Sequence, residues 1–274
     1  MPELPEVETV VRSLQENGIC GRKISGVSVN WRRSVQEPAA EDFIRILKGK
    51  TIQNMRRRGK FAVMELSGGW TALIHLRMSG RLFLGPAAAV AKHDHVVLSL
   101  DDGQVLRFHD TRKFGRWILT QNPDSVLGRL GPEPLDGIKD FHKRLHAKSR
   151  TLKLLLLDQT FVAGLGNIYV DEALWEARIH PLRKSDSLTA DESAALLKAI
   201  RTVLNKGIRN LGTSLGHGQA NFQLPGGESG RNREALNVFR QTGLPCPRCG
   251  EPIERIKVGQ RSTHICPDCQ HRGS

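Results

Sequence analysis

Two C-x-x-C pairs near the carboxyl end of the chain constrain its fold more than any other feature. They are Cys246-Pro-Arg-Cys249 and Cys266-Pro-Asp-Cys269, and residues 250–265 separate them. Each pair can present two thiolates from one turn, and two such turns close a tetrahedral four-cysteine site, the geometry that structural zinc prefers. Because protein sulfur fills all four positions, we predict one structural Zn²⁺ ion and no catalytic metal. A redox pair or two chance pairs are the alternatives, and this spacing disfavours them. A reducing compartment disfavours disulfides between these cysteines.

The segment that carries these cysteines, from residue 236 onward, lacks a hydrophobic core of its own. Metal binding worth roughly 10–16 kcal/mol can substitute for one in such small modules. Residues 253–264 lie between the two pairs and can form a β-hairpin. Arg261 would lie near its end, either free to reach a phosphate or simply a solvated charge. The fifth cysteine, Cys20, is expected to be a buried small apolar residue.

The first 130 residues predict a helix followed by a mostly β domain. Apolar side chains recur at the spacing of one buried helix face, at Val7, Val10, Val11 and Leu14. This spacing predicts a helix over 3–17. From about residue 23 to residue 120 the pattern of apolar and polar residues is typical of strands, and Asp102-Gly103 is typical of a hairpin turn.

The residues from 131 to 235 predict helices and then a loop. Gly131-Pro-Glu-Pro134 is typical of a linker, and helical patterns follow over 138–148, 151–160, 167–178 and 188–209. Gly164-Leu-Gly166 predicts a tight turn, with Asn167 as the N-cap of the next helix. Residues 212–235 are rich in glycine and lack periodicity, and a loop of that length is either disordered or functional.

The chain carries a formal net charge of +13 over 274 residues. Such a surplus favours a polyanionic partner, nucleic acid before a membrane surface, although an ordinary basic protein kept soluble by its charge would look similar. No apolar run approaches the ~18 residues of a membrane span. Glu3, Glu6 and Glu8 interrupt any secretion signal, so we expect a cytoplasmic protein with no membrane partner.

Two runs of basic residues lie in different predicted domains. One run holds no acid and contains Lys143, Arg144, Lys148, Arg150 and Lys153. The other contains Arg56, Arg57, Arg58 and Lys60. The pair suits a DNA-binding cleft between the domains, although surface solubility would explain either run by itself.

The amino-terminal Met1-Pro2-Glu3 offers a nucleophile if Met1 is removed. Pro2 would then carry a secondary amine, and a free α-amine with a reference pKa of about 7.7–8.0 is partly unprotonated at neutral pH. Attack on a sugar C1′ would give a cationic iminium that can drive strand cleavage by elimination, with Glu3 as a general acid or base. Alternatively, Pro2 only permits removal of the initiator methionine, and Glu3 and Glu6 are first-turn acids that favour the helix dipole.

The amino-terminal run Met1–Thr9 together with the four-cysteine module resembles the formamidopyrimidine-DNA glycosylases, and the resemblance extends nearly end to end. The segment from Leu155–Gln159 through Gly164–Glu172 resembles the helix–two-turn–helix DNA-binding element of that family. The resemblance implies an α+β fold: an N-terminal helix with a two-sheet β-sandwich, a helical domain, and a zinc-finger hairpin. The implied domains are 1–130, 131–235 with a lesion loop at 212–235, and 236–274.

The same resemblance implies roles for individual residues. Pro2 would be the Schiff-base nucleophile, Glu3 its proton shuttle, and Glu6 an organiser of the site. Contacts to the phosphates around the lesion would come from Lys60, Lys153, Asn167 and Arg261, and Lys60 and Arg261 would complete the catalytic set. His93 would add a phosphate contact or be a packed strand histidine. The gap left by an extruded nucleotide would be filled by Met78, Arg112 and Phe114.

The chain departs from the family pattern at two places. A Tyr-Gly-Arg-x-Gly run usually precedes the zinc module, whereas Phe239–Gly243 reads Phe-Arg-Gln-Thr-Gly here. The loop 212–235 is unusual in sequence and contains His217, Asn221 and Phe222. Because this loop covers the flipped base in the family, its divergence bears on the range of lesions more than on the chemistry.

These observations favour a bifunctional DNA glycosylase and abasic-site lyase of base-excision repair. Its expected substrates are 8-oxoguanine and formamidopyrimidines in duplex DNA, and its expected partner is damaged double-stranded DNA, bound as a monomer. We expect a bacterial cytoplasmic enzyme that associates with the nucleoid through DNA. The alternatives are an endonuclease VIII-like preference for oxidised pyrimidines and a non-catalytic damage-binding protein.

Overall fold

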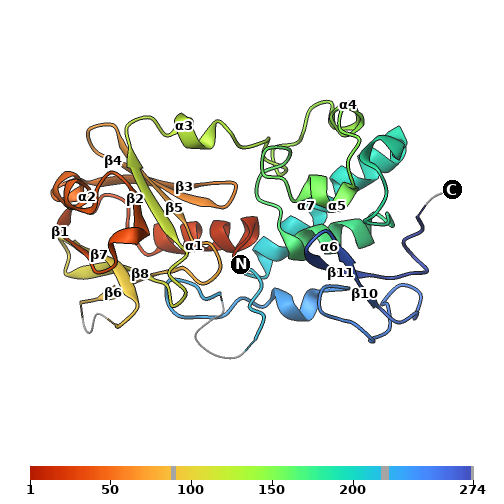
Figure 1. Ribbon diagram of the computed structural model, residues 1–274. Coiled ribbons are helices and arrows are strands. Elements are labelled where there is room, and N and C mark those ends of the chain that lie inside the picture. Colours follow the sequence, from red (N-terminus) through yellow and green to blue (C-terminus); the bar gives the residue numbers. More distant parts are fainter. Residues whose placement is uncertain (88–90, 217–221, 273–274) are drawn as a thin grey trace. The chain divides into compact units, whose positions relative to one another are not determined.

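The structure is a computed structural model that describes residues 1–87, 91–216 and 222–272 (Figure 1). The chain divides into two compact units, Met1–Arg129 with Asn210–Arg231 and Leu130–Arg209 with Asn232–Ser274. Helices and strands are both abundant, which confirms the predicted α+β class. Across the described ranges, no helix combines the length and the apolar character needed to cross a membrane.

The first unit begins with helix α1, Leu4–Glu16, close to the predicted bounds. Val7, Val10 and Leu14 of the predicted stripe have no exposed surface, so the stripe is the buried face. The helix ends before Gly18, whose φ of +73° is the left-handed conformation that favours glycine.

Two sheets form most of the first unit (Figure 1). Their strands are β1 Ile24–Val29, β2 Val35–Glu37, β3 Ile52–Arg58, β4 Phe61–Leu66, β5 Trp70–His75, β6 Arg81–Pro86, β7 Asp94–Leu100, β8 Gln104–His109 and β9 Arg116–Thr120. One sheet has the order β1-β7-β8-β6 and the other β2-β9-β5-β4-β3. Apolar side chains of both sheets, such as Leu98 and Ile74, share one core with α1. This arrangement is the predicted β-sandwich, and Gly103 lies in the predicted turn between β7 and β8.

The strand pattern expected over 23–120 is wrong in one place, because helix α2 spans Ala40–Leu47. Its Phe43 and Leu47 are fully buried in the core. A helix of about two turns is too short for its period to stand out against the surrounding strands. A second short helix, α3, spans Asp124–Leu127 at the end of the first unit.

The described residues of the predicted loop 212–235 contribute to both units. Residues 210–231 belong to the first unit, where Phe222 and Leu224 pack into the sandwich core. Isolated bridges pair Thr213 with Arg231 and Gln223 with Ser229, so the described ends of the segment lie side by side. His217 and Asn221 lie outside the described residues. The division into parts 1–130, 131–235 and 236–274 stays a prediction.

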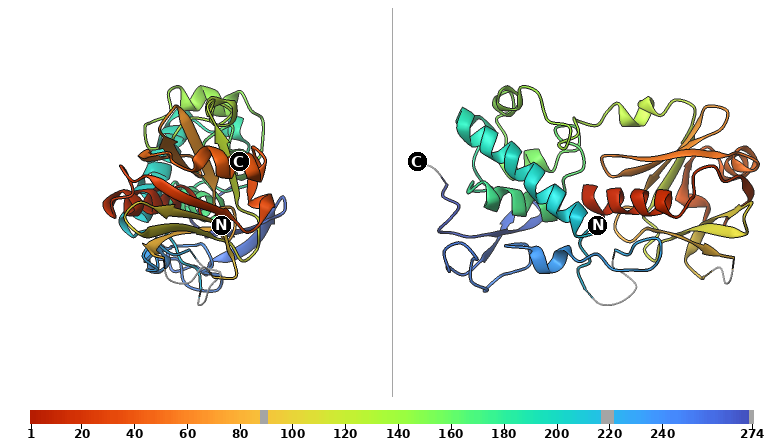
Figure 2. Two further views of the ribbon diagram at one scale, coloured as in Figure 1. Left: turned by 90° about the vertical axis from the view of Figure 1, so that its left-hand side faces the viewer. Right: turned by 180° about the vertical axis from the view of Figure 1, so that it is seen from behind.

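The second unit contains the helices α4 Phe141–His146, α5 Leu152–Leu156, α6 Asn167–Glu176 and α7 Ala190–Arg209. Helix α5 is shorter than predicted because the Asp158 carboxylate accepts hydrogen bonds from the backbone and hydroxyl of Thr160 and forms a local turn. Helix α7 packs closely on α6 (Figure 2). A Cβ atom on Gly207 would lie 2.5 Å from the Tyr169 hydroxyl, so the close contact requires glycine there.

The carboxyl-terminal hairpin also lies in the second unit. Strands β10, Glu254–Val258, and β11, Arg261–Ile265, pair antiparallel, which confirms the predicted hairpin. Strand β11 packs against α6. The hairpin is therefore held by the DNA-binding element that the sequence predicts, as well as by its cysteines.

Candidate functional site

The start of α1 fixes the predicted nucleophile and its neighbours. Pro2 is buried, and Glu3 is the N-cap of α1, with only 2% of its surface exposed. Glu3 and Glu6 form a reciprocal capping box, in which Glu6 Oε2 accepts a hydrogen bond of 2.8 Å from the Glu3 backbone amide. The first turn thus holds Glu3 in one place directly after Pro2.

Glu6 also connects α1 to the segment 210–231. Its Oε1 accepts a hydrogen bond of 2.7 Å from the backbone amide of Thr213. Gly212 has a φ of +79°, and a Cβ atom there would lie 3.0 Å from Glu6 Cγ and 2.8 Å from the Phe222 ring. A glycine is therefore needed for this close approach. Glu6 therefore holds both the start of α1 and the chain at Thr213, and its role as an organiser of the site stays a prediction.

Lys60 lies in the turn between β3 and β4, with 6% of its surface exposed. The neighbouring Arg57 fixes this turn: its Nε donates to Glu8 Oε2 over 2.8 Å, and its Nη1 donates to the Gly59 carbonyl over 3.3 Å. Arg57 thus connects the turn that carries Lys60 to α1 through Glu8.

His75, at the end of β5, was not identified from the sequence. Its Nδ1 accepts a hydrogen bond of 3.0 Å from the Arg77 backbone amide, and its ring meets the Phe61 ring edge-on at 4.8 Å. Burial, together with the charges of Arg77 and Lys60, lowers the pKa of His75 to about 3. The imidazole is therefore neutral at physiological pH and lies in the electrostatic field of Lys60. A single histidine at a strand end has no sequence signal of its own.

The three predicted gap-filling side chains lie in two neighbouring turns of the first unit. Met78 is 44% and Phe114 46% exposed, and both are among the few large apolar side chains exposed in the described chain. The Arg112 guanidinium carbon lies 5.1 Å from the centre of the Phe114 ring. Met78 and Phe114 are therefore surface residues and not core residues, and their contact with DNA stays a prediction.

His93 lies in the turn just before β7 and is half-buried. Its ring lies 5.7 Å from that of His109 and 6.3 Å from that of His95. These contacts suit the packed-histidine alternative, and the partial exposure leaves the phosphate contact open as a prediction.

In the second unit, Lys153 is fully buried and paired. Its Nζ lies 2.5 Å from Asp171 Oδ1 and 3.1 Å from the Ser262 carbonyl oxygen. Asn167 Nδ2 donates to the same carbonyl over 2.9 Å. Lys153 and Asn167 therefore hold the chain directly after Arg261, which is itself exposed.

Asn167 is the first helical residue of α6, whereas the sequence indicated it as the N-cap. The N-cap is Gly166, with φ −133° and ψ −162°. Because the Asn167 side chain is bonded to the hairpin at Ser262, it does not cap its own helix. The backbone amide of Asn167 still lies in the first turn, where the helix dipole favours an anion.

The roles of two further carboxylates of α6, those of Asp171 and Glu172, were not predicted from the sequence. Asp171 Oδ2 accepts hydrogen bonds from the His264 backbone amide and ring Nδ1, at 2.9 and 3.1 Å. Glu172 is buried and accepts hydrogen bonds from the backbone amides of Asn237, Val238 and Phe239. Burial raises the pKa of Glu172, and these hydrogen bonds oppose the shift. The residues that these two carboxylates bind lie at least 65 positions further along the chain, so no local motif could reveal the contacts.

The two basic runs are more neutralised than the sequence suggested. In the run from Arg56 to Lys60, Arg56 pairs with Glu65 and Arg57 with Glu8. In the run from Lys143 to Lys153, the pairs are Lys143 with Asp140, Arg150 with Asp158, and Lys153 with Asp171. These pairs offset part of the charge of both runs, and the DNA-binding cleft between the domains stays a prediction. Cys20, expected to be buried, is exposed.

The four cysteines of the C-x-x-C pairs converge on one point. Their sulfur atoms all lie within 4.8 Å of one another, with 3.4 Å between Cys249 and Cys266 and 4.0 Å between Cys246 and Cys269. Tetrahedral zinc with Zn–S bonds of about 2.3 Å separates its sulfurs by about 3.8 Å, so the group fits one ion. The Trp175 indole donates to Cys246 Sγ over 3.3 Å. These cysteines form a structural zinc site, as predicted.

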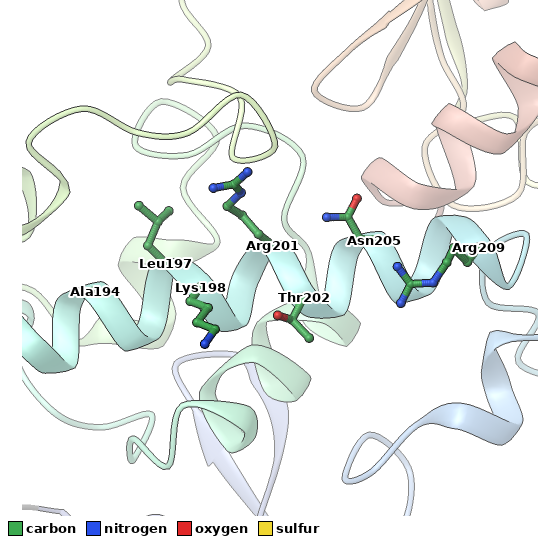
Figure 3. Close-up of a pocket in the computed structure, with 7 residues that line it drawn as sticks. All are labelled: Ala194, Leu197, Lys198, Arg201, Thr202, Asn205 and Arg209. Atoms are coloured by element: carbon green, nitrogen blue, oxygen red, sulfur yellow. The ribbon is translucent and has the colours of Figure 1, made fainter.

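A groove outside these sites runs along the exposed face of α7 (Figure 3). Its lining carries three cations and no acid: Ala194, Leu197, Lys198, Arg201, Thr202, Asn205 and Arg209. None of the predicted site residues lines it. The opposite face of α7, with Leu196, Ile200 and Leu204, is buried.

Family models match three consecutive parts of the chain. They are the formamidopyrimidine-DNA glycosylase N-terminal domain over residues 1–117, the formamidopyrimidine-DNA glycosylase H2TH domain over 130–217, and a zinc finger found in FPG and IleRS over 243–272. Together these matches cover most of the chain.

Similar proteins match along their whole length. The formamidopyrimidine-DNA glycosylase of Protochlamydia amoebophila is 44% identical over 99% of this chain and 100% of its own. That of Herpetosiphon aurantiacus is 47% identical over 98% and 100%. Among solved structures, Lactococcus lactis Fpg in complex with abasic-site DNA has a TM-score of 0.89 at 39% identity, covering 98% of this chain and 99% of that one. The same Fpg has been solved with DNA containing N7-benzyl-Fapy-dG, also with a TM-score of 0.89.

Proposed function

The chain belongs to the formamidopyrimidine-DNA glycosylase family, and from this premise we propose that it excises oxidised purines from duplex DNA and then cuts the strand. It is a DNA glycosylase of base-excision repair, with 8-oxoguanine and formamidopyrimidines as substrates. The observation that carries the proposal is the start of α1, where Pro2 and Glu3 are buried and fixed by the capping box with Glu6.

The reaction begins once Met1 has been removed. The Pro2 nitrogen attacks C1′ of the damaged nucleotide, the glycosidic bond breaks, and the base leaves with a proton that the Glu3 carboxyl supplies. The bound nitrogen then gives up its proton, the C1′–O4′ bond of the sugar ring breaks, and O4′ takes up a proton through Glu3, which leaves a cationic iminium. The iminium withdraws electrons, so loss of a C2′ proton expels the 3′ phosphate. A second elimination, with loss of the C4′ proton, expels the 5′ phosphate, and hydrolysis of the iminium frees Pro2. The product is a one-nucleotide gap with phosphate at both ends.

The phosphates beside the lesion are held by Lys60, by Arg261 and by the backbone amide of Asn167 at the start of α6. Lys153 contributes by holding the Ser262 carbonyl next to Arg261, and its own phosphate contact is part of this proposal. Met78, Arg112 and Phe114 occupy the space of the extruded nucleotide, which offsets the cost of unstacking, about a few kcal/mol. The enzyme works as a cytoplasmic monomer, associated with the nucleoid through its substrate.

The test is borohydride trapping of the untagged protein on two duplexes, one with 8-oxoguanine opposite cytosine and one with an abasic site. The proposal expects a covalent adduct on both, mapped to Pro2. Correctly trimmed Pro2→Gly should lose trapping. A chain that retains an amino-terminal extension is the matched control, because it keeps every side chain and blocks only the amine.

Each result decides between the alternatives. An adduct on the abasic duplex alone would contradict the assigned lesion, and competition with oxidised-pyrimidine duplexes would then test the endonuclease VIII-like alternative. Trapping on neither duplex, by a chain shown to begin at Pro2, would support the damage-binding alternative. Full strand cleavage by Pro2→Gly would overturn the mechanism.

A further inference from the structure

We propose that Asp110 is a positioning residue for base extrusion, an inference that rests on the proposed function. Its buried carboxylate joins two turns that carry the gap-filling side chains. The first, called the methionine turn, is residues 76–80 and carries Met78. The second, called the arginine turn, is residues 110–115 and carries Arg112 and Phe114. One carboxylate thereby fixes all three side chains relative to one another before DNA binds.

The hydrogen bonds of Asp110 reach both turns. Its Oδ1 accepts from the Ser79 hydroxyl over 2.5 Å and from the Arg112 backbone amide over 3.2 Å. Its Oδ2 accepts from the Gly115 backbone amide over 2.7 Å. Asp110 has no exposed surface and Ser79 only 4%, so water does not compete for these bonds. The residues next to Met78 and on both sides of Phe114 are thus tied to a single group.

Both turns hold a backbone conformation that needs such support. Arg77, next to Met78, has a φ of +55°, and Lys113, between Arg112 and Phe114, has a φ of +60°. Non-glycine residues rarely adopt this left-handed region, and they persist there only where surrounding contacts hold them. The Lys113 ammonium lies 4.1 Å from the centre of the Trp31 ring, which supports the arginine turn from a second side.

Both turns pack closely on the core beneath them. A Cβ atom on Gly115 would lie 2.3 Å from the Phe108 ring, and one on Gly80 would lie 2.9 Å from the same ring. Phe108 is fully buried in the sandwich core. The turns are therefore anchored below by the core and bridged by Asp110, while Met78 and Phe114 remain exposed.

This arrangement separates extrusion from chemistry. A wedge that is already ordered enters the base stack without a further loss of conformational freedom, so preorganisation lowers the barrier to extrusion. Asp110 is not a group that reacts with the sugar. Its loss should therefore slow excision of an intact damaged base and leave attack on a pre-formed abasic site close to normal.

The experiment compares Asp110→Asn and Ser79→Ala with wild type in single-turnover excision of 8-oxoguanine and in trapping on an abasic duplex. We expect excision to fall about ten- to hundredfold in Asp110→Asn and less in Ser79→Ala, with abasic trapping within about twofold of wild type. A 2-aminopurine base beside the lesion reports extrusion and should show the same slowing. Thr111→Ala, in the same turn but only half-buried, is the matched control and should behave as wild type.

Two results would overturn the inference. One is wild-type excision in both variants. The other is an equal loss of excision and abasic trapping together with a lower Tm, because that would show a general role in folding. If Asp110→Asn does not fold, the excision and trapping rates of Ser79→Ala test the inference, since that variant keeps the hydrogen bonds from Arg112 and Gly115 to Asp110. Failure of the wild-type protein to trap on either duplex would instead refute the proposed function.

Discussion

At the scale of single residues, Glu6 combines two structural tasks in one side chain. One carboxylate oxygen caps α1 through Glu3, and the other holds the chain at Thr213. Both partners are backbone amides, so each oxygen accepts and neither can be replaced by a donor. The same carboxylate therefore sets the position of Glu3 beside the nucleophile and of the segment that begins at Gly212.

Glu6→Gln should destabilise the protein, because the side-chain amide would place a donor against a backbone donor in a buried site. We expect a loss of about 1–3 kcal/mol in the free energy of unfolding, measured by urea denaturation. Glu16→Gln is the control, since Glu16 lies exposed at the end of the same helix and should change the free energy by less than about 0.5 kcal/mol. Equal stability of the two variants would contradict the role of Glu6.

His75 should make the stability of the first unit depend on pH. Its pKa in the folded protein, about 3, lies below the unfolded value of about 6.5. As the pH falls through this window, the unfolded chain takes up a proton that the folded protein does not, so stability is lost. The slope due to this residue is at most about 1.4 kcal/mol per pH unit.

The measurement is the free energy of unfolding of wild type and His75→Gln between about pH 7 and pH 5. The variant should lose less stability on acidification, and its glutamine can still accept from the Arg77 amide. His271→Gln, at an exposed histidine, should keep the wild-type slope. Identical slopes in wild type and His75→Gln would show that His75 is not the source.

At the scale of elements, the ion pair between Lys153 and Asp171 attaches the carboxyl-terminal hairpin to the helices. Lys153 comes from α5, Asp171 from α6, and both reach β11, through Ser262 and His264 respectively. Both side chains of the pair have no exposed surface. Removing one partner of such a pair leaves an uncompensated buried charge.

Lys153→Met should therefore cost about 3–5 kcal/mol of stability, and the Tm of the second unit should fall. Lys143→Met is the matched control, because its pair with Asp140 is exposed, with a separation of 3.8 Å, and is worth at most about 1 kcal/mol. Calorimetry of the zinc-loaded protein measures both. A small effect in both variants would mean that Lys153 is not held as the structure indicates.

At the scale of the whole molecule, DNA affinity should depend on salt through the phosphate contacts. About four side-chain contacts, from Lys60, Lys153, Arg261 and His93, imply a slope of log affinity against log salt near −3 to −4. Arg261→Gln should make this slope shallower by about 0.9. Binding of an abasic duplex across a salt series measures it.

The control for this prediction lies in the same hairpin. Lys257→Gln removes an exposed charge from β10 that has no predicted contact with DNA, and the slope should stay near the wild-type value. An equal change in both variants would indicate the effect of net charge, and a nearly flat wild-type response would refute the contact set.

The sequence by itself determined the features whose physical cause is local. The apolar stripe of α1, the turn at Gly103, the hairpin between the cysteine pairs and the zinc ligands all follow from spacings of a few residues. The amino-terminal motif and the gap-filling trio depended on family resemblance, since Met78 and Phe114 alone would have been taken for core residues.

Only the tertiary structure decided which charges are paired and which turns are joined. Arg57 pairs with Glu8 and Lys153 with Asp171, and Asp110 accepts a hydrogen bond from Ser79. The partners in each pair are separated by more than one turn or element along the chain. Residues 210–231 also return to the first unit, where Phe222 enters its core. Burial and hydrogen bonding depend on which residues are neighbours in space. Folding brings these neighbours together from distant positions in the sequence, and no periodic pattern marks such pairs.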